Sequence, residues 1–65
     1  MTPEQKSAFV NSQVACALIE AMGMQAKNQQ RIYFGYSLAY DEEAFRELID
    51  KYGISRNAVL RQMLP

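Results

Sequence analysis

Histidine is absent from this chain of 65 residues, and cysteine occurs once, at Cys16. Without histidine the chain lacks the most common general base and metal ligand near neutral pH. One cysteine can form neither a disulfide within the chain nor a cysteine-based metal site. We therefore expect no enzyme, no metal and no cofactor, and we predict that Cys16 is a small buried side chain without chemistry of its own.

Long apolar runs are also missing. No stretch approaches the roughly 18 apolar residues of a membrane span, and the first residues lack the apolar segment of a signal peptide. Seven basic residues balance seven acidic ones, so the formal net charge is zero and gives no general attraction to nucleic acid. We expect a cytoplasmic protein with no membrane partner.

The chain is also too short for a large core. A domain of this size buries only about 60% of the surface of its unfolded chain, so its stability is marginal. No repeat or linker divides it, which predicts a single helical domain over residues 1–65. Self-association would remedy the small core, and we expect a homo-oligomer.

Helix signals begin at the first residues. Thr2 suits an N-cap, Pro3 suits the first helical position, and Gln5 completes a capping box. Apolar residues then recur at steps of three and four, the spacing of one helical stripe. The stripe comprises Val10, Val14, Ala17 or Leu18, Ala21 or Met22, and Met24. We expect this helix to run to about Lys27 and its apolar stripe to mediate self-association.

Two shorter helices are predicted in the C-terminal part. Asp41 is the N-cap of the first, Gly53 ends it, and Glu47 is spaced to pair with Lys51. Its expected buried face is Phe45, Leu48, Ile49 and Tyr52. Ser55 is the N-cap of the second, which runs to the end of the chain. The predicted fold is therefore all-α: a small three- to four-helix domain with a long N-terminal helix and a C-terminal helix-turn-helix-like pair.

The connection over residues 28–40 contains an aromatic cluster around Gly35, whose lack of a side chain permits a positive φ and the close approach of a ligand. The rings belong to Tyr33, Phe34, Tyr36 and Tyr40. Such rings either supply core bulk or, beside cationic side chains, stack on bases and anchor interfaces. We expect an irregular or partly helical segment. Its candidate contact residues for a ligand or partner are Lys27, Arg31, Tyr33, Tyr36 and Tyr40.

The C-terminal third resembles a helix-turn-helix motif in the stretch D-E-E-A-F-R-E-L-I-D-K-Y-G-I-S-R-N-A-V-L-R-Q-M. The resemblance implies DNA binding through four exposed positions that would face the major groove. These positions are Arg56, Asn57, Arg61 and Gln62. The same pattern is also typical of a generic corner between two short helices, so both interpretations stay open.

A shorter tract, Asn28-Gln29-Gln30-Arg31 followed by Gly35-Tyr36 and later Glu42-Glu43, resembles the N-Q-x-R-x-x-x-G-Y tract of phage sponge proteins that sequester cyclic oligonucleotide signals. That resemblance implies phosphate neutralisation by the cationic candidate residues and base stacking by the tyrosines. As a whole, the chain also resembles the compact accessory proteins of phage genomes.

Together these observations predict a non-enzymatic small binding protein, of the phage accessory or anti-defence kind, that captures a host protein or a cyclic nucleotide by sequestration. The Tyr/Arg-rich segment would make the contact, in the host cytoplasm if the chain is phage-encoded. The alternative is a helix-turn-helix transcriptional regulator that binds DNA.

Overall fold

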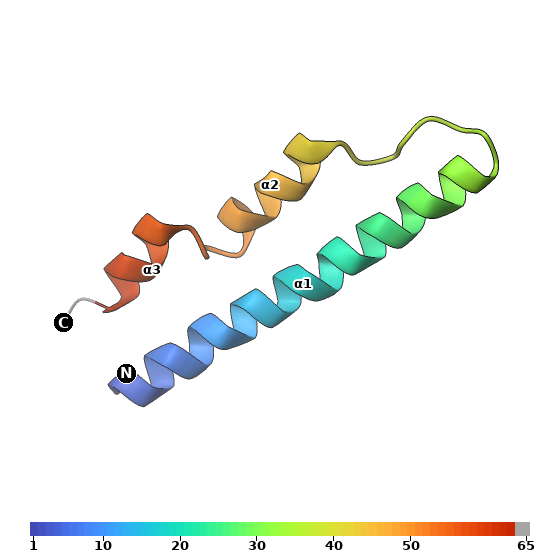
Figure 1. Ribbon diagram of the computed structural model, residues 1–65. Helices are drawn as coiled ribbons and strands as arrows, with labels where there is room; N and C mark the ends of the chain where they lie inside the picture. The colour runs from blue at the N-terminus through green and yellow to red at the C-terminus, as the bar shows by residue number, and fades with distance from the viewer. Residues whose placement is uncertain (64–65) are drawn as a thin grey trace.

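The computed structural model describes residues 1–63, with side chains to residue 61, as a helical hairpin (Figure 1). The elements are α1 (Pro3–Tyr33), α2 (Glu42–Lys51) and α3 (Arg56–Met63). α1 forms one arm, while α2 and α3 return along it in succession as the second arm. The all-α class is confirmed. The expected three- to four-helix domain is corrected, because within residues 1–63 α2 and α3 both contact α1 and not each other, so the helices join into two arms.

The N-terminus of α1 is capped as its sequence predicts. The Thr2 hydroxyl accepts a hydrogen bond from the Gln5 N–H at 3.1 Å, and the Gln5 side chain accepts one from the Thr2 N–H at 3.0 Å. Pro3 occupies the first helical position. These contacts satisfy backbone donors that have no partner within the helix.

The C-terminus of α1 lies six residues beyond the expected end at Lys27, so that prediction was wrong. The helix continues through Tyr33 and ends because Gly35 adopts a φ of 76°. The N–H groups of Gly35 and Tyr36 donate to carbonyls in the last turn at 3.0 and 2.8 Å. This pair of bonds is a Schellman motif, which a glycine at positive φ favours.

The first short helix begins and ends at the predicted residues, and the second begins where predicted, while its predicted end at the end of the chain lies outside the described residues. The Asp41 carboxylate accepts from the Ala44 N–H at 2.9 Å at the start of α2, and Gly53, with a φ of 63°, follows its end. The Ser55 hydroxyl accepts from the Ala58 N–H at 3.2 Å at the start of α3. The start of each short helix is therefore fixed by a side-chain hydrogen bond encoded in its own sequence.

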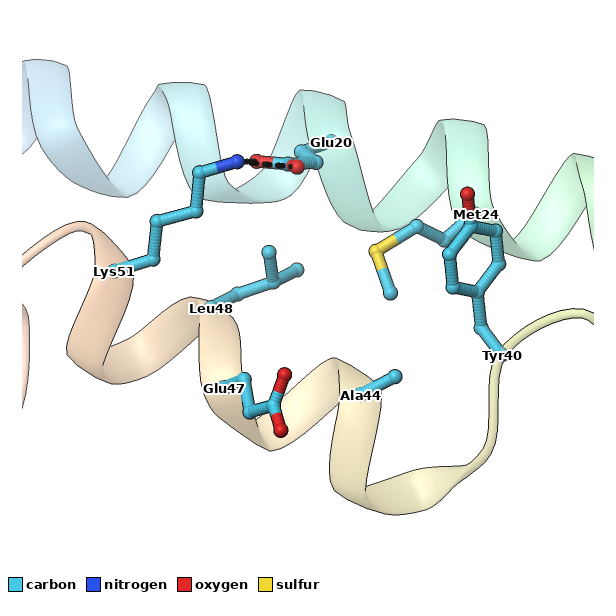
Figure 2. Close-up of a pocket in the computed structure, with 7 residues that line it drawn as sticks. All are labelled: Glu20, Met24, Tyr40, Ala44, Glu47, Leu48 and Lys51. Carbon is cyan, nitrogen blue, oxygen red and sulfur yellow. Dashed lines mark hydrogen bonds and ion pairs between the residues drawn. The ribbon is translucent and has the colours of Figure 1, made fainter.

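The core is small and lies between the two arms. Ala17 and Met24 of α1 and Leu48 of α2 are exposed by 7%, 8% and 7%. Figure 2 shows Leu48 pointing from α2 toward α1 and Met24 pointing from α1 toward α2. Val10, Ala21, Phe45 and Tyr52 are half-buried around them. This part of the predicted apolar faces is confirmed.

Four residues expected inside are exposed, which corrects the prediction: Val14, Met22, Ile49 and Cys16. Of the two alternatives Ala17 and Leu18, Ala17 is buried and Leu18 is exposed. A helix rotates by about 100° per residue, so a single neighbouring arm covers only one side of it. Because the chain forms two arms, nothing within residues 1–63 covers the remaining sides of α1 and α2. The side chain of Gln62 lies outside the described residues.

The molecule is long and thin. Its radius of gyration is 15.1 Å and its extents are 51 × 17 × 10 Å. A compact domain of 65 residues has a radius of gyration of about 11 Å. Among the described residues, no helix has the length and apolar character needed to cross a membrane.

Candidate functional site

Three of the four candidate rings are well exposed at the C-terminal end of α1. Tyr33 is 84% exposed, Phe34 58% and Tyr36 62%. We call these three residues the aromatic end. Tyr40 lies apart from it, 37% exposed, beside Met24 in the hollow between α1 and α2 (Figure 2). The interpretation of the cluster as core bulk is therefore wrong, because the second arm returns along α1 without covering it.

The aromatic end is a connected row of rings. The ring centroids of Tyr33 and Phe34 are 5.3 Å apart with the planes at 83°, an edge-to-face contact. Those of Phe34 and Tyr36 are 6.2 Å apart with the planes at 34°. Both separations fall in the range of favourable aromatic pairs. The rings therefore support one another in place and present one apolar surface.

Arg31 connects the aromatic end to the following loop. Its guanidinium carbon lies 5.6 Å from the centroid of the Tyr36 ring, within the range of a cation–π contact. Its Nε donates a hydrogen bond to the Ser37 carbonyl at 2.6 Å. The side chain is half-buried. Arg31 therefore orients the ring and the loop, in addition to placing a positive charge beside them.

A shallow hollow of about 240 Å³ adjoins the aromatic end. It is lined by Lys27, Gln30, Arg31, Phe34 and Tyr36. The structure thus brings together three of the five predicted contact residues and leaves the other two tyrosines outside. Gln30 was missed by the prediction, although it lies one helical turn after Lys27. A hollow with two cations and two rings suits a planar group that carries negative charge.

Asn28 holds the loop against α1, a role the sequence did not reveal. Its Oδ1 accepts hydrogen bonds from the N–H groups of Ala39 and Tyr40 at 3.0 and 2.9 Å, and its Nδ2 donates to the Tyr40 carbonyl at 2.7 Å. One amide side chain thereby satisfies three backbone groups of a loop that forms no regular structure. We call these three hydrogen bonds the Asn28 clamp. The aromatic end is bounded by the Asn28 clamp on one side and by the end of α1 on the other.

A polar cluster joins the two arms near their middle. Lys51 Nζ lies 2.7 and 3.0 Å from the two carboxylate oxygens of Glu20, and the Tyr52 hydroxyl donates to the same carboxylate. Lys51 therefore forms its ion pair with Glu20 of α1 and not with Glu47, the partner expected from the sequence. Hydrogen bonds from Lys51 and Tyr52 lower the pKa of Glu20, and the bond to Glu20 raises the pKa of each donor.

The candidate DNA-binding residues lie at the other end of the molecule. Arg56, Asn57 and Arg61 are exposed on α3, while the side chain of Gln62 lies outside the described residues. In a helix-turn-helix motif the two helices pack against each other at about 90–120°. Here α2 and α3 follow one another along α1 without mutual contact among residues 42–63 (Figure 1).

Comparison with known proteins gives this chain no family. No protein-family model, no curated protein and no solved structure matches it. Evidence for a function therefore comes from the residues themselves. Among the surfaces described above, the aromatic end with the adjoining hollow combines exposed rings, two cationic side chains and an ordered backbone.

Proposed function

We propose that the chain is a small, non-enzymatic binding protein that captures its target through the aromatic end and acts by occupying or sequestering it. The observation that carries this proposal is the exposure of three contiguous rings beside Arg31. Soluble monomers rarely expose a contiguous cluster of large apolar side chains, and such a cluster is typical of a site covered by a partner.

A protein target is the first candidate. Tyrosine and arginine are enriched among the residues that dominate binding energy at protein interfaces. Two further apolar side chains close to the rings in sequence, Ile32 and Leu38, are 61% and 53% exposed and add to the apolar surface at this end of the molecule. A surface of that extent is broader than the face of a single nucleobase.

A nucleotide signal is the second candidate, and the hollow favours it. Lys27 and Arg31 would neutralise a phosphate while the Phe34 and Tyr36 rings contact the base. The sequence alternative, DNA binding through α3, retains one supporting feature, the absence of acidic residues after Lys51. In that case Arg56 and Arg61 would contact phosphates.

The test compares Tyr36→Ala with Phe9→Ala, which removes another exposed ring near the opposite end of α1. Both immobilised variants and the wild type are incubated with lysate, and each is titrated with cyclic dinucleotides and with duplex DNA at two salt concentrations. A target bound through the aromatic end loses roughly 30-fold or more in affinity with Tyr36→Ala, the effect of about 2 kcal/mol at a central contact, and little with Phe9→Ala.

The class of target is identified by which ligand binds the wild type and loses affinity for one of the variants. A protein retained by the wild type and Phe9→Ala, but not by Tyr36→Ala, supports the first candidate; a cyclic dinucleotide with the same pattern supports the second. Salt-sensitive DNA binding that Arg56→Gln with Arg61→Gln abolishes and Tyr36→Ala spares would refute the proposal in favour of the DNA-binding alternative.

A further inference from the structure

The side of α1 that points away from the second arm carries an apolar stripe of its own. We call it the outer face of α1, which consists of five apolar residues and one polar residue at its end: Ala15, Leu18, Ile19, Met22 and Ala26, with Asn11. All six are exposed, and Leu18, Ile19 and Met22 are exposed by 59%, 70% and 68%. At about 100° per residue, these positions lie roughly opposite the buried Ala17 and Met24. α1 is therefore apolar on two sides, of which the second arm covers one.

The outer face lies in a part of α1 that is almost free of charge. From Ser7 to Ala26 the sole charged residue is Glu20, and its carboxylate is bound by Lys51 and Tyr52 of the second arm. The uncharged surface thus extends for about 30 Å along the helix. The exposed side of a helix in a soluble monomer ordinarily carries charged and polar residues.

The exposed area of the chain exceeds that of a compact monomer. A folded monomer of 7.4 kDa exposes about 4,200 Å², whereas this chain exposes 5285 Å². The excess of roughly 1,100 Å² is larger than the about 800 Å² that each partner contributes to a stable protein interface. One additional interface along the hairpin would bring the area per chain back to the expected value.

We propose that a second copy of this chain covers the outer face, with the two α1 helices packed antiparallel about a twofold axis between residues 18 and 19. The stripe is self-complementary about that point, because its positions are symmetric around it: 11 lies opposite 26, 15 opposite 22 and 18 opposite 19. Small residues meet large ones: Ala15 lies opposite Met22 of the second copy, and Leu18 lies near the axis opposite Ile19 of the second copy.

Charge and dipoles specify the direction of pairing. In a parallel pair the two Glu4 carboxylates would lie near each other and the helix dipoles would be aligned. In the antiparallel pair the two Glu4 carboxylates lie at opposite ends of the assembly and the helix dipoles are opposed. The antiparallel dimer also places the two aromatic ends at opposite ends of the assembly, where Tyr33 is in line with the outer face while Phe34 and Tyr36, which follow the last residue of α1, lie beyond the paired helices.

The first test is the mass of the full chain in solution by light scattering, at concentrations up to several hundred micromolar. The wild type should have twice its 7.4 kDa mass. Leu18→Glu should halve it, because two carboxylates would be buried near the axis. Leu60→Glu introduces the same change at a position of similar exposure, 52%, on α3 and should leave the dimer intact. A monomeric wild type, or an equal response of the two variants, would overturn the proposal.

Cross-linking tests the register and does not depend on the folding of a charged variant. In a Cys16→Ser background, a mixture of Ala15→Cys and Met22→Cys chains should form a mixed disulfide under mild oxidation. Ala15→Cys alone should not, because the two equivalent positions lie about 10 Å apart along the antiparallel helices, beyond the reach of a disulfide. Efficient cross-linking of Ala15→Cys alone, without the mixed product, would indicate a parallel pair and refute the proposed arrangement.

Discussion

At the scale of single residues, Asn28 and Glu20 connect parts of the chain that are far apart in sequence. Asn28 makes three hydrogen bonds to a loop that begins after the end of its own helix. Glu20 binds two side chains of the second arm. Neither contact follows from a local pattern, because each depends on the return of the chain along α1.

We expect Asn28→Ala to destabilise the fold by about 1–2 kcal/mol, since each hydrogen bond contributes on the order of 1 kcal/mol and the loop is partly solvated. Urea denaturation followed by circular dichroism measures the change. The control is Gln29→Ala, an exposed neighbour on the same helix, which should be almost neutral. Equal stability of the two variants would show that the clamp contributes nothing.

The pKa changes at the Glu20 cluster predict how stability depends on pH. The lowered pKa of Glu20 means that its contribution is present above the unfolded value of 4.5 and is lost as the pH falls through the folded pKa. The raised pKa values of Lys51 and Tyr52 mean that their contributions are present below 10.5 and 10.0 and are lost as the pH rises further.

Thermal melts from pH 3 to 11 should therefore give a plateau in Tm with a decrease at each end. The curve of Glu20→Gln should be flatter than that of the wild type in both regions, because the variant lacks the carboxylate that both donors bind. Glu47→Gln, which alters a neighbouring carboxylate outside the cluster, should retain the wild-type shape. Curves of identical shape for all three proteins would contradict the assignment.

At the scale of elements, two of the three glycines end helices, whereas the third lies inside a helix and weakens it. Gly35 and Gly53 have φ values of 76° and 63°, whereas Gly23 lies inside α1. A Cβ added at any of the three would meet no atom within 4 Å, so backbone conformation alone decides the effect. The three positions therefore form a matched set of substitutions.

We expect Gly35→Ala and Gly53→Ala each to destabilise the protein by roughly 1–2 kcal/mol, the cost of a left-handed conformation for an L-residue. Gly23→Ala should stabilise it by about 1 kcal/mol through helix propensity. Midpoints of urea denaturation measure all three. A destabilising Gly23→Ala, or a neutral Gly53→Ala, would be inconsistent with these helix boundaries.

The elements were largely predictable from sequence, because caps are local. Thr2, Asp41, Ser55 and Gly53 marked four helix boundaries correctly. The end of α1 was missed because the aromatic residues were interpreted as an irregular connection and Gly35 as room for a ligand. Gly35 ends α1 in the same way as Gly53 ends α2, and this similarity could have predicted where α1 ends.

Exposure was less predictable, and the candidate site depends on it. Adjacent apolar positions such as Ala17 and Leu18 suit a stripe equally well, and the position of the second arm decides that Ala17 is buried and Leu18 is exposed. The same long-range packing leaves Tyr33 and Tyr36 uncovered. Periodicity identifies an apolar helix but not which of its sides has a partner.

At the scale of the whole molecule, a thin hairpin with a small core gains stability from association. If two chains fold and pair together, the melting temperature rises with protein concentration. A tenfold increase corresponds to about 1.4 kcal/mol per dimer and, for two chains of this length, to a rise of about 5 °C. Differential scanning calorimetry at 20 and 200 micromolar measures it, and a dissociated Leu18→Glu should show no such dependence.

The Asn28 clamp has a consequence for how fast and how tightly the aromatic end would bind. Rings on an unanchored loop lose conformational entropy when a partner immobilises them, which costs affinity. Here the loop is fixed at both ends, by the Schellman motif at Gly35 and by Asn28 beside Tyr40. Folding has already ordered the backbone that carries the rings, so a partner would encounter a preorganised surface and bind it as a rigid body.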